Sequence, residues 1–181
     1  MERSKGSLEK AGEKARNIRL IAFDVDGVLT DGKINYSSSG EEIKSFDIKD
    51  GHAMKLAKRA GIIIAFITGR TSGVVQQRAD ELGVEHVYQG AVEKTEALDA
   101  LLSETGLAAE EVAFIGDDLI DIPVIQRVGL GCSVSDGVEE VRTRADLVTS
   151  APGGGGAGRE LIEFILKAQG LWDDIISKYL V

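Results

Sequence analysis

Short apolar runs, each followed by polar residues, recur along the chain and constrain its fold more than any other feature. Runs that are apolar throughout are typical of strands buried on both faces of a parallel sheet. They lie at residues 19–23, 61–69, 86–90, 112–117, 129–135 and 145–150. Amphipathic segments of helical length separate them, at residues 52–60, 72–82, 92–104, 119–127, 138–143 and 158–169. The alternation predicts an α/β fold, a Rossmann-like doubly wound parallel sheet with helices on both faces.

Three segments depart from this alternation. Residues 32–48 hold two alternating segments around "SSSG", which predicts a small β-hairpin inserted into the fold. Residues 1–17 mix charged and small residues without an apolar run, so we expect an N-terminal tail, either a frayed helix or disordered. Residues 151–158 contain "PGGGG" and are predicted to form a mobile Gly-rich arm. The remainder, residues 18–181, is expected to form a single domain.

Charge and cysteine content limit the partners of the chain. The 181 residues carry a formal net charge of −9 and a pI near 4.8. Nucleic acids and anionic membranes are bound through an excess of Lys and Arg, so neither is expected as a partner, and a small molecule is. The single cysteine, Cys132, allows no disulfide within the chain and fits a reducing compartment. No segment approaches the length of a membrane span, so we expect a cytoplasmic protein.

Polar side chains gather where the predicted strands end. Because ligands of an open parallel sheet bind beyond the carboxyl ends of its strands, these residues indicate the site. They are Asp24 and Asp26 after the first strand, Thr68, Gly69 and Arg70 after the second, Lys94 after the third, and Asp117, Asp118 and Asp121 after the fourth. Clustered carboxylates repel one another unless a hard cation lies between them. We therefore predict Mg²⁺ bound by the carboxylates of Asp24 and Asp117 and the backbone carbonyl of Asp26.

The same residues suggest phosphoryl-transfer chemistry. An aspartate is normally ionised at neutral pH, so Asp24 can attack phosphorus as a nucleophile without a partner base. Asp26, two residues on, can protonate the leaving oxygen and then activate water. Lys94 and the Thr68 hydroxyl can hold the remaining phosphate oxygens.

Purely structural interpretations of some of these residues stay open. Thr68 could be an ordinary helix N-cap, and Lys94 a solvated helix lysine. Asp118 and Asp121 flank a helix start, where acidic residues complement the helix dipole. Asp31 is expected to cap backbone donors of the hairpin. The only histidines, His52 and His86, are too few for a metal site of imidazole type.

Four motifs carry a resemblance to a known family. "DVDGVLTDG", "ITGR", Lys94 and "GDDLID" resemble, in order, those of the haloacid dehalogenase superfamily of phosphohydrolases. "GEEIKSFDIKDG" and "VYQGAVEKTEAL" are similar to its small capless branch, the 3-deoxy-D-manno-octulosonate 8-phosphate phosphatases. The resemblance implies the haloacid dehalogenase fold without a cap domain. It also implies Mg²⁺-dependent hydrolysis of this sugar acid phosphate through an aspartyl phosphate, in lipopolysaccharide precursor synthesis.

Two alternatives remain. One is the same chemistry on an acylneuraminate or KDN 9-phosphate, and the other is a non-catalytic regulatory module that has kept the fold.

The resemblance further implies the substrate contacts. It places Asp47, Ile48, Lys49, Asp50 and Gly51 over the sugar, and Asp26 and Lys94 against the substrate. Lys49, Lys55, Arg70 and Arg78 are expected to form a local positive group for a small anionic sugar phosphate. A homotetramer is also implied, in which hairpins assemble centrally and neighbouring subunits complete each site. Arg159, at the end of the arm, would then reach the phosphate or sugar in an adjacent subunit.

Overall fold

A six-stranded parallel sheet forms the centre of the protein, whose computed structural model describes residues 5–180. The strand order is β5-β4-β1-β6-β7-β8. The strands are β1 (Leu20–Phe23), β4 (Ile63–Ile67), β5 (His86–Tyr88), β6 (Val112–Gly116), β7 (Leu130–Ser133) and β8 (Leu147–Val148). Each lies within one of the six predicted runs, so the predicted α/β sheet is confirmed.

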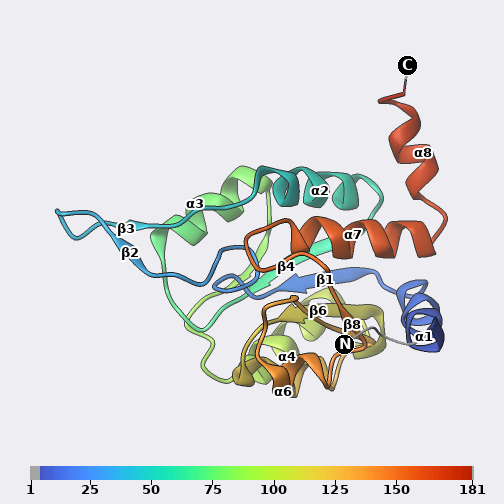
Figure 1. Ribbon diagram of the computed structural model, residues 1–181, viewed down its shortest axis with the longest axis horizontal. Helices are drawn as coiled ribbons and strands as arrows, with labels where there is room; N and C mark the ends of the chain where they lie inside the picture. Colours follow the sequence, from blue (N-terminus) through green and yellow to red (C-terminus); the bar gives the residue numbers. More distant parts are fainter. Residues whose placement is uncertain (1–4, 181) are drawn as a thin grey trace.

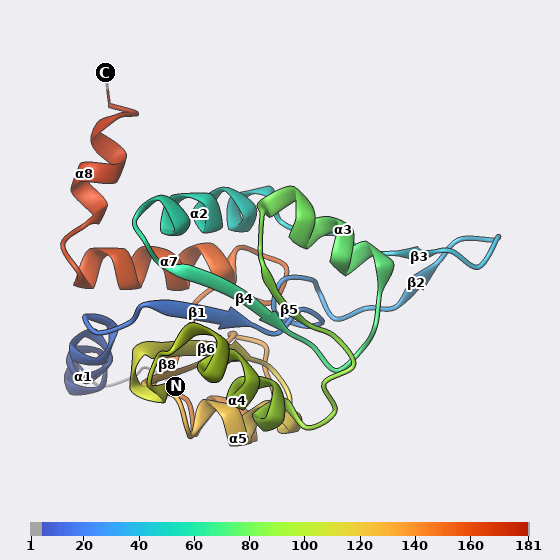
Figure 2. The same cartoon turned by 180° about the vertical axis from the view of Figure 1, so that it is seen from behind.

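Helices cover both faces of this sheet (Figure 1). One face carries α2 (Ile48–Arg59), α3 (Gly73–Leu82) and α7 (Ala157–Ala168). The other carries α4 (Lys94–Thr105), α5 (Ile122–Ile125) and α6 (Glu139–Arg142), with short 3₁₀ turns η1 (Ala109–Glu111) and η2 (Leu119–Asp121). A last helix, α8 (Trp172–Ser177), leads away from α7 (Figure 2).

Alternating side chains of the central strands build two separate cores. In β1, Ile21 and Phe23 pack under α2, α3 and α7, whereas Leu20 and Ala22 pack against the helices of the opposite face. All four side chains are fully buried, and complete burial of a large apolar side chain stabilises the fold by about 1.5–3 kcal/mol. The two cores explain why β1 is apolar at every position, as a strand covered on both faces must be.

The hairpin is shorter than predicted. Only β2 (Asn35–Tyr36) and β3 (Glu42–Ile43) pair, antiparallel, within the predicted range 32–48. They project from the body of the protein at the end of the sheet opposite to α1 (Lys5–Ala15) (Figure 1). Helix α2 begins at Ile48 rather than at residue 52, because the Asp47 carboxylate accepts a hydrogen bond from the Lys49 N–H (2.7 Å) and caps it there.

Residues 5–15 are part of the domain rather than a tail. They form α1, whose Ala11 and Ala15 are one turn apart and are buried against the core that includes α7. The Gln169 side-chain amide, just after α7, donates to the backbone carbonyls of Ala15 (3.0 Å) and Ile18 (2.7 Å). Two small residues give a weak apolar signal in a highly charged segment, which explains why the packing was not predicted. None of the helices within residues 5–180 is both long enough and apolar enough to cross a membrane.

The Gly-rich segment 151–158 is packed in place within its own chain. A Cβ on Gly153 would lie 1.9 Å from the Gly27 carbonyl oxygen, so only glycine fits against the loop after β1. The Gly153 N–H donates to Asp136 Oδ1 (2.9 Å) and the Gly154 N–H to the Val28 carbonyl (3.0 Å). Close backbone packing therefore requires glycine at residue 153, a requirement that composition alone did not indicate.

Candidate active site

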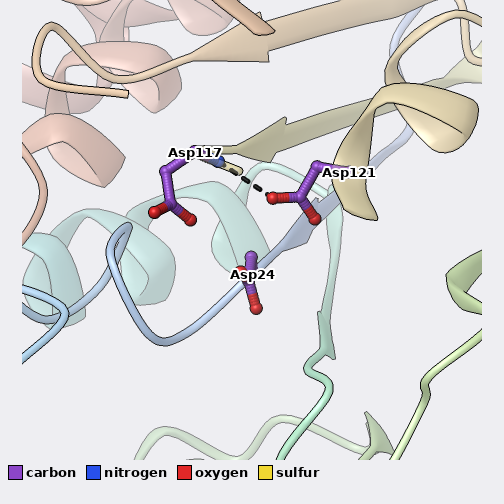
Figure 3. Close-up of side chains that lie close together, drawn as sticks. All are labelled: Asp24, Asp117 and Asp121. Carbon is purple, nitrogen blue, oxygen red and sulfur yellow. Dashed lines mark hydrogen bonds between the residues drawn. The ribbon is translucent and has the colours of Figure 1, made fainter. Parts of the chain in front are cut away.

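Three carboxylates meet at the carboxyl ends of β1 and β6. These strands are neighbours, with Phe23 in register with Ile115, so Asp24 and Asp117 emerge side by side. Asp121 approaches from η2, and one oxygen from each of the three carboxylates lies within 4.8 Å of the others (Figure 3). Gly27 makes room for this arrangement, since a Cβ there would lie 2.1 Å from Asp117 Oδ2.

Asp121 organises the cluster and is fully buried. Its Oδ2 accepts hydrogen bonds from the backbone N–H groups of Asp117 (2.9 Å) and Asp118 (3.1 Å), and the first of these is drawn in Figure 3. Its Oδ1 accepts from Lys94 Nζ (2.6 Å). From the sequence, Asp121 was left between a structural and a functional role. The structure places Asp121 in the acidic cluster, because the tight turn of η2 directs its carboxylate back toward the strand end. Asp118 caps the turn and is exposed.

Lys94, the first residue of α4, joins two of the acids. Its buried Nζ lies 2.9 Å from Asp24 Oδ2 and 2.6 Å from Asp121 Oδ1. Burial pulls the pKa of Lys94 down, but Asp24 and Asp121 outweigh that effect and raise the pKa overall. The ammonium group is therefore charged at neutral pH, and Lys94 is not the solvated lysine of the structural alternative.

The cluster contains more negative charge than Lys94 can compensate. Burial raises the pKa of Asp24 to about 6, with Lys94 opposing and Asp121 adding to the rise. Burial, followed by Asp24 and Asp121, raises the pKa of Asp117 to about 8. Asp117 Oδ1 is buried and has no hydrogen-bond partner. A hard divalent cation between Asp24 and Asp117 would supply both the missing charge and the missing partner, so the residues fit Mg²⁺.

Mg²⁺ affinity is expected to weaken as the pH falls. With a pKa of about 8 in the metal-free protein, Asp117 is mostly protonated below pH 8 and must lose its proton to bind the cation. The apparent dissociation constant should therefore rise by about tenfold per pH unit between pH 8 and 6, with about one proton released per ion. Calorimetry in buffers of different ionisation enthalpy measures both quantities. Equal affinity at pH 6 and 8 would contradict the account.

Thr68 lies at the same edge of the sheet. It follows β4, which pairs with β1 so that Phe66 is in register with Phe23, and its side chain is buried. It is not a helix N-cap, because Ser72 caps α3 by accepting a hydrogen bond from the Val75 N–H. The Ala91 N–H donates to the Thr68 carbonyl (3.0 Å), which ties this loop to the one preceding Lys94.

A second group of charges, the hairpin cluster, surrounds the side chain of Asp26. It consists of Asp26, Glu42, Lys44 and Arg70. Lys44 Nζ contacts the Asp26 carboxylate and lies 3.4 Å from Glu42 Oε1. Arg70 lies 3.7 Å from Asp26 Oδ2 and 2.8 Å from Glu42 Oε1. Arg70, predicted as a cation for the substrate, is thus paired with carboxylates of its own chain. Glu42 and Lys44 were not predicted, because charged residues in a hairpin are usually solvated.

The residues predicted to cover the sugar lie at the start of α2 and differ in solvent exposure. Ile48 and Lys49 are exposed, whereas Asp50 and Gly51 are buried. Asp50 Oδ1 accepts a hydrogen bond from the Arg159 backbone N–H (2.6 Å), so this carboxylate joins α2 to the start of α7. Burial raises the pKa of Asp50 to about 6, although the Arg159 N–H opposes the rise. Asp50 therefore has a structural contact in this chain that the sequence did not indicate.

Three further predicted substrate-binding cations are Arg78, Lys55 and Arg159, and the two arginines pair with glutamates of their own helices. Arg78 pairs with Glu81 (3.2 Å) and stacks over the Phe46 ring, and Lys55 is an exposed residue of α2. The Arg159 guanidinium pairs with Glu163 and lies 5.3 Å from the centre of the Trp172 ring.

Asp31 and the two histidines each have a side-chain contact within the chain. Asp31 accepts a hydrogen bond from the Lys33 N–H (3.1 Å), as predicted for a local cap. His52 meets Tyr179 edge to face, and His86 Nδ1 lies 3.2 Å from Glu104.

Comparison with known proteins decides the family. Residues 86–156 match the family model of haloacid dehalogenase-like hydrolases. The 3-deoxy-D-manno-octulosonate 8-phosphate phosphatase of Escherichia coli K12 is 46% identical over 161 residues, which cover 89% of this chain and 86% of the relative. The chain belongs to the 3-deoxy-D-manno-octulosonate 8-phosphate phosphatase family. The family member of Yersinia pestis is 43% identical over 157 residues, 87% of this chain and 84% of the relative.

Solved structures of this phosphatase family share the fold over nearly the whole chain. The Moraxella catarrhalis phosphatase, in complex with a magnesium ion, a phosphate ion and KDO, superposes with a TM-score of 0.93 at 44% identity, covering 94% of this chain and 98% of that one. The cobalt-bound Haemophilus influenzae phosphatase gives a TM-score of 0.84 at 41% identity, covering 87% and 92%. The predicted fold and the assignment to phosphomonoester hydrolases are thereby confirmed.

Proposed function

We propose that the chain hydrolyses 3-deoxy-D-manno-octulosonate 8-phosphate to 3-deoxy-D-manno-octulosonate and phosphate, a step in lipopolysaccharide precursor synthesis. One observation carries the proposal: a buried Lys94 ammonium 2.9 Å from the Asp24 carboxylate, at the strand end of a chain 46% identical to a phosphatase for this substrate. This pair provides an anionic nucleophile and a cation for the phosphate at one point of the sheet edge.

Asp24 is positioned to form the covalent intermediate. The Val25 N–H donates to Asp24 Oδ1 (2.7 Å) while Lys94 holds Oδ2, so the carboxylate has a fixed orientation. A carboxylate oxygen attacks phosphorus, the bond from phosphorus to the sugar oxygen breaks, and an aspartyl phosphate forms. The Lys94 ammonium and the Thr68 hydroxyl hold the equatorial phosphate oxygens, where negative charge develops.

Asp26 moves the protons in both halves of the reaction. Its carboxylic acid donates a proton to the departing sugar oxygen, so the sugar leaves as an alcohol rather than as an alkoxide. The resulting carboxylate then takes a proton from water as that water attacks the aspartyl phosphate. Phosphate leaves, Asp24 is again a carboxylate, and Asp26 is again a carboxylic acid because it keeps the proton taken from water.

The acidic centre would hold Mg²⁺ through the carboxylates of Asp24 and Asp117 and the backbone carbonyl of Asp26. When bound, the ion neutralises charge between the carboxylates and the phosphate oxygens. Asp121 would support the site from outside the ligand set, since both of its oxygens already accept hydrogen bonds from Lys94 and the backbone.

Substrate preference tests the proposal. With Mg²⁺, kcat/KM for 3-deoxy-D-manno-octulosonate 8-phosphate should exceed that for N-acetylneuraminate 9-phosphate and KDN 9-phosphate by at least about 100-fold, a ratio that hydrogen-bonded recognition of a sugar can supply. EDTA should remove the activity, and Mg²⁺ should restore it. A preference for either nine-carbon substrate would assign the same chemistry to a different sugar.

We also propose a homotetramer in the cytoplasm. The projecting hairpin exposes three large apolar side chains, Ile34, Tyr36 and Ile43, which favours its burial between subunits. The hairpin is too small to enclose the site, so a neighbouring subunit would have to exclude water from it. Sedimentation velocity of the whole chain measures the assembly.

The single buried thiol of Cys132 fits a reducing compartment, which supports a location in the cytoplasm.

A further inference from the structure

Lys44 is a buried cation outside the proposed catalytic residues. It follows β3 in the hairpin, yet only 1% of its side chain is exposed, whereas the neighbouring hairpin residues Ile43 and Ser45 are exposed. Burying an ammonium group costs free energy unless it is paired. Its partners are the carboxyl group of Asp26 and the carboxylate of Glu42, so the burial is compensated within the hairpin cluster.

The hairpin cluster is attached to the residues that precede α3. Glu42 accepts a hydrogen bond from the Ser72 hydroxyl and pairs with Arg70. Ser72 is also the N-cap of α3. The hydrogen bond from the Ser72 hydroxyl, helped by the charges of Lys44 and Arg70, lowers the pKa of Glu42 although burial opposes it, so this carboxylate is charged at neutral pH. Lys44 is therefore fixed by protein groups before any substrate binds.

The geometry leaves one oxygen of Asp26 available. Lys44 engages Oδ1, whereas Oδ2 is buried without a hydrogen-bond partner, and Arg70 lies 3.7 Å from it. Lys44 and the more distant Arg70 together restrict the orientation of the carboxyl, and Oδ2, which has no hydrogen bond, is the oxygen left for proton transfer. Alignment of a general acid with the proton it transfers is a condition for its efficiency.

We propose that Lys44 is a positioning residue, which orients the Asp26 carboxyl for proton transfer and thereby couples the placement of the hairpin to turnover. The inference rests on the proposed function, because that function gives Asp26 its role. It adds a residue of the hairpin to the catalytic apparatus of the same subunit, whatever neighbouring subunits contribute.

A double-mutant cycle on the whole protein tests this role. Lys44→Met should lower kcat by about tenfold or more, a part of the 10²–10⁴-fold that general acid–base catalysis supplies, and leave KM within about twofold. Lys44→Arg, which retains the charge, should recover part of the loss. In the Asp26→Asn background, Lys44→Met should cost almost nothing further, because the group that it positions is gone. Lys33→Met, at an exposed hairpin lysine, is the matched control and should behave as the unaltered protein.

Three outcomes would overturn the proposal. The first is an unchanged kcat in Lys44→Met. The second is a rise in KM alone, which would make Lys44 a substrate ligand. The third is an equal fall in kcat on Lys44→Met in the presence and absence of the Asp26 carboxyl. If Lys44→Met does not fold, Lys44→Gln takes its place in the cycle, with thermal melting as the check. The cycle is also run on p-nitrophenyl phosphate. This separates a wrong role for Lys44 from a wrong sugar substrate, because a wrong sugar assignment leaves the activity on p-nitrophenyl phosphate intact.

Discussion

Replacing Asp24 by asparagine is expected to abolish phosphatase turnover while the protein remains folded. The amide cannot attack phosphorus, and removal of a nucleophile lowers kcat by several orders of magnitude, at least about 10⁴-fold here. The fold should tolerate the change, because burial raises the pKa of Asp24 to about 6 and a neutral side chain at this position avoids that cost. Steady-state kinetics and a thermal melt measure the two effects.

Asp31→Asn provides the control for this substitution. Asp31 lies in the same "DVDGVLTDG" segment but is exposed and pairs only locally with Lys33, so its loss should change kcat little. A folded Asp24→Asn protein with near-normal turnover would show that the nucleophile is another group.

Replacing Lys94 by methionine is expected to damage both stability and turnover. The methionine fills similar space but leaves Asp24 and Asp121 without the cation that lies 2.9 and 2.6 Å from them. Removal of one partner from a buried ion pair typically costs about 3–5 kcal/mol in the free energy of unfolding. Loss of a preorganised cation at the phosphate should also lower kcat by about 10²–10³-fold. Urea denaturation and kinetics at saturating substrate measure the two losses.

Lys10→Met controls for the loss of a lysine as such, since Lys10 is an exposed residue of α1. The Lys94 account is contradicted if Lys94→Met is as stable as Lys10→Met, or if it keeps more than half of the normal kcat.

The sheet and the main acidic residues could be predicted from the sequence because both follow from local patterns. A strand covered on two faces is apolar at every position, as in β1, and the residue after such a strand must lie at the sheet edge. Asp24, Asp26, Thr68 and Asp117 are all found there by position alone. Parallel pairing then brings together residues almost a hundred positions apart in the sequence, such as Phe23 and Ile115.

Contacts that depend on side-chain direction could not be predicted in this way. A lysine in a hairpin is usually solvated, and only the structure shows that Lys44 turns inward to Asp26. The buried position of Asp50 depends on where α7 begins, more than a hundred residues later. Composition alone predicted that Arg159 and the glycines before it form a mobile arm. Composition cannot distinguish a mobile segment from one in which close packing requires glycine, as the packing of Gly153 against Gly27 does.

The stereochemistry at phosphorus tests the central claim, that Asp24 forms a covalent intermediate, most directly. The substrate for this measurement is an isotopically chiral phosphorothioate analogue of 3-deoxy-D-manno-octulosonate 8-phosphate, hydrolysed in labelled water with Mg²⁺ present. Attack by Asp24 followed by attack of water inverts the configuration twice, so the account predicts overall retention. Inversion would show a single displacement by water and would contradict the account.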